Sequence, residues 1–100
     1  MSLNTLEMQQ TSQELRANLG ISGLTVPDLA TELDMEPTTV ESVLAMDGSA
    51  DPADVWLVRD HMQNTILMRR RTPFPYTRLT DEMRTVAKSW FSLHEAPLPR

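Results

Sequence analysis

The sequence predicts an all-α fold of about five helices, with a helix-turn-helix core and a long fourth helix. Apolar residues recur at intervals of three and four along most of the chain, as on the buried face of an amphipathic helix. Helix start signals stand at Thr25, Asp51 and Thr80, each a capping side chain followed by proline or by acids. No segment shows the strict apolar–polar alternation of a half-buried strand, so no strand is expected.

The first helix is expected from about Asn4 to Leu19. Residues spaced four, three and four apart form its inner face, namely Met8, Ser12, Leu15 and Leu19. Gly20 follows at the position where glycine commonly ends a helix in the left-handed conformation. We therefore expect the chain to leave the helix at Gly20.

The second and third helices form the predicted helix-turn-helix at residues 25–46. Thr25 is the N-cap of the second helix, whose buried stripe repeats at i, i+3, i+4 and i+7 in Val26, Leu29, Ala30 and Leu33. The turn is expected at Asp34, Met35 and Glu36. Pro37 then opens a short third helix with three inward residues, Val40, Val43 and Leu44.

The fourth helix starts at Asp51-Pro52, is expected to reach about Arg70, and is apolar on more than one side. Val55, Val58, Met62 and Ile66 make one stripe, and Trp56 and Leu67 lie off it. A helix with two apolar faces is either an interface helix or a central core helix. The first interpretation predicts a homodimer that uses Trp56 and Leu67, and the second predicts that the other helices cover them.

The C-terminal third is expected to contain an extended break and a fifth helix. Two prolines bracket Phe74 and force an extended path, from which Phe74 and Tyr76 are expected to pin the segment to the core. The fifth helix follows the Thr80 cap, with an inner stripe of Met83, Val86, Ala87 and Trp90. Residues 1–93 are expected to form one domain and residues 94–100 a disordered tail. The predicted core includes Leu33, Val40, Leu44, Val58, Met62 and Trp90.

Residues 29–44 resemble the helix-turn-helix of bacterial transcriptional regulators. A small residue, Ala30, stands where the second helix crosses closely, and apolar residues seat the third helix at the usual spacing. The one departure is Asp34, where glycine is usual, and aspartate tolerates the left-handed region better than most residues. The resemblance implies regulation linked to double-stranded DNA, with the third helix as the recognition helix.

The chain as a whole resembles a small bacterial family known as domain of unknown function 2316, over about residues 1–93. The resemblance rests on the opening Met-Ser-Leu-Asn, on residues 21–24, on Asp51-Pro52 before Val55-Trp56-Leu57 and Arg59-Asp60, and on Trp90-Phe91. It implies an all-helical protein with no established activity, and it supplies no functional residues.

The charge pattern complicates a DNA-binding interpretation. Residues 1–54 hold ten acids and a single base, Arg16, whereas residues 55–100 hold eight bases and four acids. The outward residues of the recognition helix that are candidates for DNA contact, Thr38, Thr39 and Ser42, therefore have no cation near them in sequence. Phosphate contacts supply much of the affinity for DNA, so Arg69, Arg70 and Arg71 would have to provide them.

Two alternatives to DNA binding remain open at this point. The three arginines could complement the dipole of a helix C-terminus, or could pair with the acidic half of the same domain. In that case the helices would serve a protein–protein interaction module without DNA binding, because one fold can carry either function.

Other function classes lack the residues they need. The chain has no cysteine, only three glycines and no phosphate-binding loop, and neither His61 nor His94 has a carboxylate at metal-ligand spacing. We therefore expect no enzyme activity, no cofactor and no metal. The opening residues do not resemble a signal peptide, and no apolar run approaches the ~18 residues of a membrane span, so we expect a cytoplasmic protein without membrane contact.

Overall fold

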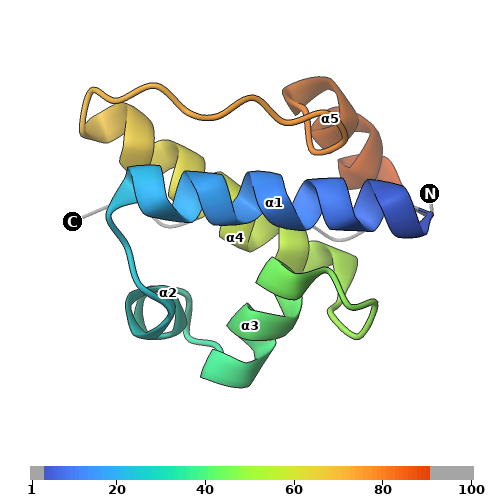
Figure 1. Cartoon of the computed structure of the whole chain (residues 1–100), viewed down its shortest axis with the longest axis horizontal. Coiled ribbons are helices and arrows are strands. Elements are labelled where there is room, and N and C mark those ends of the chain that lie inside the picture. Colours follow the sequence, from blue (N-terminus) through green and yellow to red (C-terminus); the bar gives the residue numbers. More distant parts are fainter. Residues whose placement is uncertain (1–3, 91–100) are drawn as a thin grey trace.

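The structure, a computed structural model, describes residues 4–90 of the chain, with side chains as far as residue 89. These residues form five helices and no strand, which confirms the all-α prediction (Figure 1). The helices are α1 (Thr5–Ser22), α2 (Val26–Leu33), α3 (Pro37–Ala45), α4 (Pro52–Met68) and α5 (Asp81–Trp90). None of them is both long enough and apolar enough to cross a membrane.

The long helix α4 is central to the described chain and packs against α1, α2 and α3. In Figure 1, α1 crosses α4, α2 and α3 lie together on one side of α1, and α5 lies on the other. We call residues 70–80 the strap, because they leave the end of α4 and run back over α1 to reach α5. The layout supports the interpretation of α4 as a central core helix.

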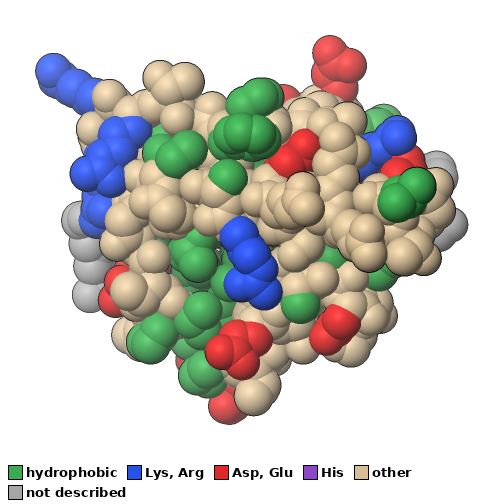
Figure 2. All heavy atoms as spheres, viewed as in Figure 1, with side chains coloured by type: hydrophobic (Ala, Val, Ile, Leu, Met, Phe, Trp, Pro, Cys, Tyr) green, Lys and Arg blue, Asp and Glu red, His purple; other side chains and the backbone are tan. Residues whose placement is uncertain are grey.

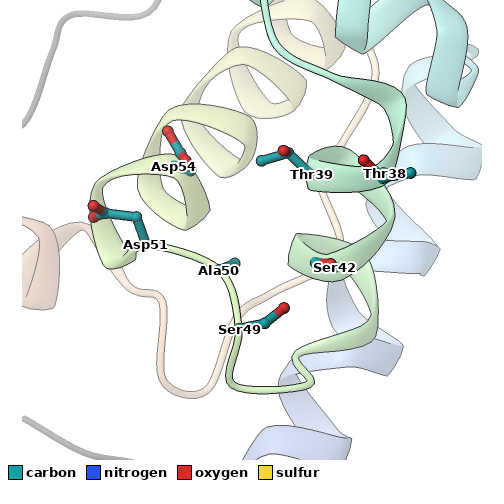
Figure 3. A pocket seen from close by; sticks show the side chains of 7 residues that line it. All are labelled: Thr38, Thr39, Ser42, Ser49, Ala50, Asp51 and Asp54. Carbon is teal, nitrogen blue, oxygen red and sulfur yellow. The ribbon is translucent and has the colours of Figure 1, made fainter.

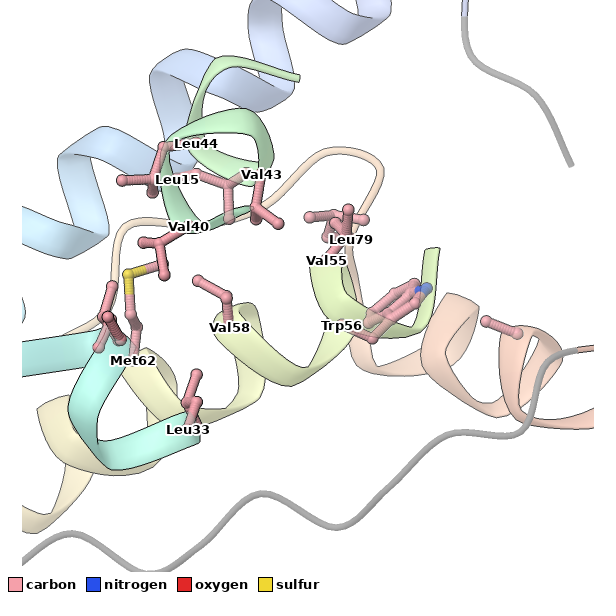
Figure 4. Close-up of a cluster of buried hydrophobic side chains, with 13 residues drawn as sticks. Leu15, Leu33, Val40, Val43, Leu44, Val55, Trp56, Val58, Met62 and Leu79 are labelled. Carbon is pink, nitrogen blue, oxygen red and sulfur yellow. The ribbon is translucent and has the colours of Figure 1, made fainter. Parts of the chain in front are cut away.

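The core lies between α4 and the helices around it (Figure 4). Of the six predicted core residues, five are confirmed: Leu33 is 9% exposed, and Val40, Leu44, Val58 and Met62 are 0% exposed. The sixth, Trp90, has its side chain outside the described part, as does the predicted tail at residues 94–100. The rest of the buried cluster includes Leu15, Leu29, Val43, Val55, Trp56, Leu79 and Ala87.

Helix α1 begins as predicted and ends later than predicted. Asn4 and Glu7 form a capping box, each side chain accepting a hydrogen bond from the other's backbone N–H. Gly20 lies within the helix, and the left-handed residue that ends it is Gly23, at φ +76°. The prediction of an end at Gly20 is wrong because a second glycine, three residues later, makes the turn.

Helix α1 also buries a polar face that its apolar spacing did not predict. Leu15 is fully buried, but Met8, Ser12 and Leu19 are only half-buried. The other buried residues of the helix are polar: Thr11, Glu14, Asn18 and Ser22. Buried polar groups need hydrogen-bond partners, and the strap supplies several of these.

The α2–α3 unit has the predicted boundaries. The Thr25 side chain caps α2 through the backbone N–H of Asp28, and Pro37 occupies the first turn of α3. Asp34 ends α2 in the left-handed conformation, at φ +53°, with its N–H bonded to the carbonyl of Ala30. The departure from glycine at this position is therefore tolerated in the geometry that was expected.

Helix α4 ends at Met68 rather than near Arg70, and its termination is an unusual one. The N–H of Arg70 bonds to the carbonyl of Leu67 and that of Arg71 to the carbonyl of Ile66, which is the Schellman pattern. Arg70 occupies the left-handed position of this motif, at φ +57°, where glycine is usual. The chain thus reverses direction at a residue that does not favour the required conformation.

The two apolar faces of α4 are used differently from the dimer prediction. Trp56 is 3% exposed and belongs to the core of one chain, so its side chain offers no surface for a dimer, contrary to the prediction. Leu67 is 55% exposed and Met68 is 66% exposed. Among the candidate interface residues, only Leu67 remains available at the surface.

Two expectations for the C-terminal third are also corrected. Phe74 is 45% exposed, and its backbone N–H and carbonyl form hydrogen bonds with Asn18 of α1, while Tyr76 is half-buried beside the core. Val86 is 41% exposed, so the inner stripe of α5 is made by Ala87 and Met83 without it.

Candidate binding face of the third helix

The candidate DNA-contacting side chains of α3 lie on one outward face of that helix. Val40, Val43 and Leu44 anchor α3 in the core. Thr38 is exposed and Thr39 and Ser42 are half-buried on the opposite side, as Figure 3 shows. The structure therefore brings these three predicted residues together.

A shallow hollow of ≈ 320 Å³ lies between α3 and the start of α4 (Figure 3). Its lining is polar and acidic, and consists of Thr38, Thr39, Ser42, Ser49, Ala50, Asp51 and Asp54. Asp51 caps α4 by accepting a hydrogen bond from the N–H of Ala53 at 2.8 Å. The two carboxylates of this hollow, Asp51 and Asp54, thus belong to the N-cap and the first turn of α4.

A second hollow of ≈ 470 Å³ touches the same helix and shares Thr38 and Ser42 with the first. It is also lined by Glu41 and Asp47 and by one cation, Arg16 of α1. Ser12, one turn before Arg16, donates a hydrogen bond of 2.6 Å to the carbonyl of Leu44, which fixes this side of α1 against α3. Arg16 was not among the predicted site residues, although its i, i+4 spacing from the inward residue Ser12 could have indicated it.

The loop between α3 and α4 holds a carboxylate in its charged form. Asp47 accepts hydrogen bonds from the hydroxyl of Ser49 at 2.7 Å and from its N–H at 2.9 Å. These bonds, led by the hydroxyl, lower the pKa of Asp47 below its ordinary value. Asp47 therefore stays ionised at the edge of the second hollow.

Acidic side chains lie at the start of α3, on α3, in the loop that follows it and in the first turn of α4. Four of them are exposed and one is half-buried: Glu36, Glu41, Asp47, Asp51 and, half-buried, Asp54. In the described part of the chain, no Lys or Arg forms an ion pair with any of them. Figure 2 shows acidic side chains over α3, a basic side chain between α1 and α3, and further basic side chains gathered where α4 ends.

The three consecutive arginines lie at the end of α4 and line neither of these hollows. Arg69 donates a hydrogen bond to the carbonyl of Ser22, and Arg71 donates one of 2.7 Å to the carbonyl of Ile21. Both carbonyls belong to the last turn of α1, which has no basic residue of its own. The guanidinium groups of Arg69 and Arg71 thus complement the negative end of the dipole of α1, whereas the sequence interpretation named the helix at whose C-terminus the arginines themselves stand.

Other cations of the C-terminal half are bonded within the fold. Arg59 is 3% exposed, pairs with Asp60 at 2.9 Å and Asp81 at 2.8 Å, and lies over the rings of Trp56 and Tyr76. Its hydrogen bond and charge lower the pKa of Asp81. Arg84 pairs with Asp60, and Arg78 pairs with Glu7 of α1. The internal use of these cations leaves the face of α3 acidic.

His61 is fully buried and joins α4 to α2. Its Nε2 lies 2.8 Å from Oε1 of Glu32, which is half-buried. No group of three or more potential metal ligands occurs in the residues that the structure describes. We therefore interpret His61 as a structural link between two helices, and His94 lies outside the described residues.

Comparison with known protein families gives a match over most of the chain. The family model described as an uncharacterized protein conserved in bacteria, DUF2316, matches residues 1–92. No curated protein and no solved structure matches the chain. The match agrees with the resemblance to this family that the sequence shows.

Proposed function

The chain belongs to DUF2316, a bacterial family of uncharacterised proteins, and we propose its function from its own geometry. The protein is a non-catalytic interaction module that binds a cationic segment of a partner protein on the outward face of α3. This proposal takes the second of the two functions that the sequence left open, and the distribution of charge supports it.

The observation that carries the proposal is the imbalance of charge around α3. Glu41, Asp47, Asp51 and Asp54 line the two hollows beside its outward face, and among the described residues Arg16 is the one cation that lines them. DNA phosphates would meet a negative surface here, whereas lysine and arginine side chains would meet a complementary one. Thr38 and Ser42, which line both hollows, can add hydrogen bonds to the main chain of a bound segment.

Titration with synthetic peptides tests this proposal. We expect a lysine- and arginine-rich peptide to bind saturably and to shift the NMR signals of Thr38 and Ser42, and a neutral peptide of the same length not to bind. Higher ionic strength should weaken binding, since exposed charges are screened.

Charge-removing variants locate the site. Glu41→Gln and Asp54→Asn should each weaken binding by about two- to fivefold, the range expected for the loss of one ion pair at the surface. Glu82→Gln is the matched control, because Glu82 is an exposed acid in the first turn of α5 and lines neither hollow. An equal effect of all three variants would show non-specific attraction and would contradict the proposal.

A second candidate, DNA-linked regulation, is favoured by one observation. Arg16 reaches the same hollow as Thr38 and Ser42, so a cation from α1 could contact a phosphate beside the outward face of α3. Fluorescence anisotropy with duplex DNA from upstream of the protein's own gene, at two salt concentrations, tests this candidate. Affinity should fall by about 0.9 log units per log unit of salt for each phosphate neutralised.

Two single substitutions separate the possible phosphate contacts in that assay. Arg16→Gln should weaken DNA binding if α3 is the recognition helix, and Arg70→Gln should do so if the arginine cluster carries the contacts. Arg70 is preferred for this purpose because Arg69 and Arg71 also cap α1. Saturable duplex binding that Arg16→Gln abolishes would replace the protein-interaction proposal, and no binding at low salt would exclude the DNA candidate.

A further inference from the structure

Beyond the role of α3, we propose that a second copy of this chain binds the surface of α1 and α4 that the strap and α5 cover. The two chains exchange residues 70–90, so that each strap and each α5 make on the partner the contacts that they make in the single chain. The product is a domain-swapped dimer with a hinge at Arg69–Arg71. Four features of the structure carry this inference.

The hinge is the first feature. Arg70 adopts the left-handed conformation at φ +57°, which disfavours residues that carry a Cβ. None of residues 66–72 is glycine, and the sequence alone favours a helix through Arg70. Pro73 is the first residue that opposes helix, through its effect on Thr72. If α4 continued through Arg71, the strain at Arg70 would be relieved and the strap would point away from its own chain.

The polar attachment of the strap is the second feature. The Thr77 N–H and hydroxyl donate to the two carboxylate oxygens of Glu14, at 3.0 and 2.7 Å. Asn18 donates to the carbonyl of Phe74 at 2.9 Å and accepts from its N–H at 2.8 Å. Glu14 and Asn18 are buried, so if the strap leaves, each needs replacement hydrogen-bond partners, which the strap of a second chain supplies.

The anchoring of α5 is the third feature. Arg59 of α4 donates to the carbonyl of Leu79 at 2.9 Å and pairs with Asp81, and Asp60 pairs with Arg84. If the strap and α5 left without replacement, the charges of Arg59 and Asp60 would stand without these partners beside Trp56. An identical segment from a second chain restores every one of these bonds, which no unrelated partner does.

The fourth feature is the latch that holds the hinge closed. Arg69 and Arg71 bond to the carbonyls of Ser22 and Ile21, and the Cβ that any other residue would add at Gly23 would lie 2.7 Å from Nη1 of Arg69. These two bonds stabilise the single-chain form, whereas the strain at Arg70 between them favours the exchanged form. The single-chain form and the exchanged dimer share all other contacts, so a high protein concentration favours the dimer and a low one favours the single chain.

Light scattering on two variants of Arg70 tests the hinge. Arg70→Gly removes the strain, and Arg70→Ala removes the same charge but keeps a Cβ. After refolding at high protein concentration, we expect dimer from the natural chain and from Arg70→Ala, and a dimer dissociation constant at least about tenfold higher for Arg70→Gly. Monomer at every concentration for the natural chain and Arg70→Ala overturns the proposal.

Cross-linking distinguishes exchange from a simple face-to-face dimer. The chain has no cysteine, so Glu7→Cys and Arg78→Cys, made in separate chains, each add a single thiol at an ion-paired position. The two variants are refolded together and treated with a bismaleimide, and we expect a covalent heterodimer. Gln9→Cys in place of Glu7→Cys is the control and should not react across chains. A dimer that gives no Glu7→Cys to Arg78→Cys product overturns the exchange.

Discussion

At the residue scale, Leu44 shows how strongly one side chain can determine stability. It is fully buried in the core, and its backbone carbonyl also accepts a hydrogen bond from the Ser12 hydroxyl of α1. We expect Leu44→Ala to lower the free energy of unfolding by roughly 2–5 kcal/mol, through lost transfer energy and a residual cavity.

Urea unfolding followed by circular dichroism measures this loss. Leu6→Ala is the matched control, because Leu6 is 75% exposed and its truncation should change stability by less than about 0.5 kcal/mol. Similar values for the two variants would contradict the assigned core.

Tyr76 is the second residue whose environment gives a measurable prediction. Its hydroxyl oxygen is buried and has no hydrogen-bond partner among the described residues, and burial raises its pKa to about 12. A raised pKa favours the protonated form in the folded state. The resulting stability is therefore present below the ordinary value near 10 and is lost as pH rises toward about 12.

Ultraviolet absorbance measures that ionisation directly, because Tyr76 is the only tyrosine of the chain. We expect tyrosinate to form near pH 10 in denaturant and only at higher pH in the native protein. Tyr76→Phe should remove the signal and leave stability unchanged or slightly higher, since it deletes an unpaired polar atom. Native titration near pH 10 would contradict the burial of the phenol.

At the scale of elements, α1 contacts its neighbours through buried polar side chains as well as through apolar ones. Asn18 forms two hydrogen bonds with the backbone of Phe74, across 56 residues of sequence. We expect Asn18→Leu to destabilise the protein by roughly 1–3 kcal/mol for each backbone group left unpaired, although it adds an apolar side chain. Gln13→Leu, on the exposed side of the same helix, is the control.

The melting temperatures of Asn18→Leu and Gln13→Leu show whether the loss of these hydrogen bonds outweighs the added apolar side chain. A stabilising effect of Asn18→Leu would mean that the buried face of α1 is apolar in character. The strap would then not depend on the hydrogen bonds described above.

The turn between α2 and α3 is a second element with a specific prediction. Asp34 adopts the left-handed conformation at φ +53°, where glycine has no steric cost. We expect Asp34→Gly to raise the free energy of unfolding by about 0.5–1 kcal/mol, less any entropy that the glycine adds to the unfolded chain. Thr31→Gly, at an exposed position within α2, should instead lower it by about 0.3–0.5 kcal/mol, the difference in helix propensity between threonine and glycine. Denaturant unfolding measures the free energy of unfolding of both variants. A lower free energy of unfolding for Asp34→Gly than for the natural chain would contradict the left-handed conformation of Asp34.

At the scale of the whole molecule, the charges divide between two uses. The acids around α3 are exposed, while the cations Arg59, Arg69, Arg71, Arg78 and Arg84 are bonded within the fold. Besides the buried apolar residues Leu79 and Ala87, the strap and α5 are held by charged and polar contacts, whereas α2 and α3 are held to α4 chiefly by the apolar core. The ion pairs that include an exposed side chain, Arg59 with Asp81 and Arg78 with Glu7, are weakened by salt to a greater degree than the apolar core.

Native-state hydrogen exchange should reveal this division. We expect the amides of α5 to exchange through a partial opening of lower free energy than the amides of α4, and added salt to lower it further. Equal opening free energies in α5 and α4 would show that the chain unfolds as one unit, and would contradict the division.

Local features of the sequence determined the helices and the core. The cap at Thr25, the turn at Asp34 and the inward positions of Val40 and Leu44 each depend on residues within one or two helical turns, so a single sequence reveals them. The outward face of α3 followed from the same spacing. The family resemblance also needed no structure, because it rests on residues in the order of the chain.

Only the tertiary structure decided which distant groups meet. Arg69 caps a helix that ends 47 residues earlier, and Glu14 bonds to Thr77 across 63 residues. The apolar spacing of α1 does not mark its buried polar residues, and nothing in the spacing of a polar residue identifies its distant partner, so the second buried face of α1 was not predicted. Trp56 similarly satisfied two interpretations in sequence, because an apolar side chain is stabilised equally by its own core or by a partner, and only packing selects one.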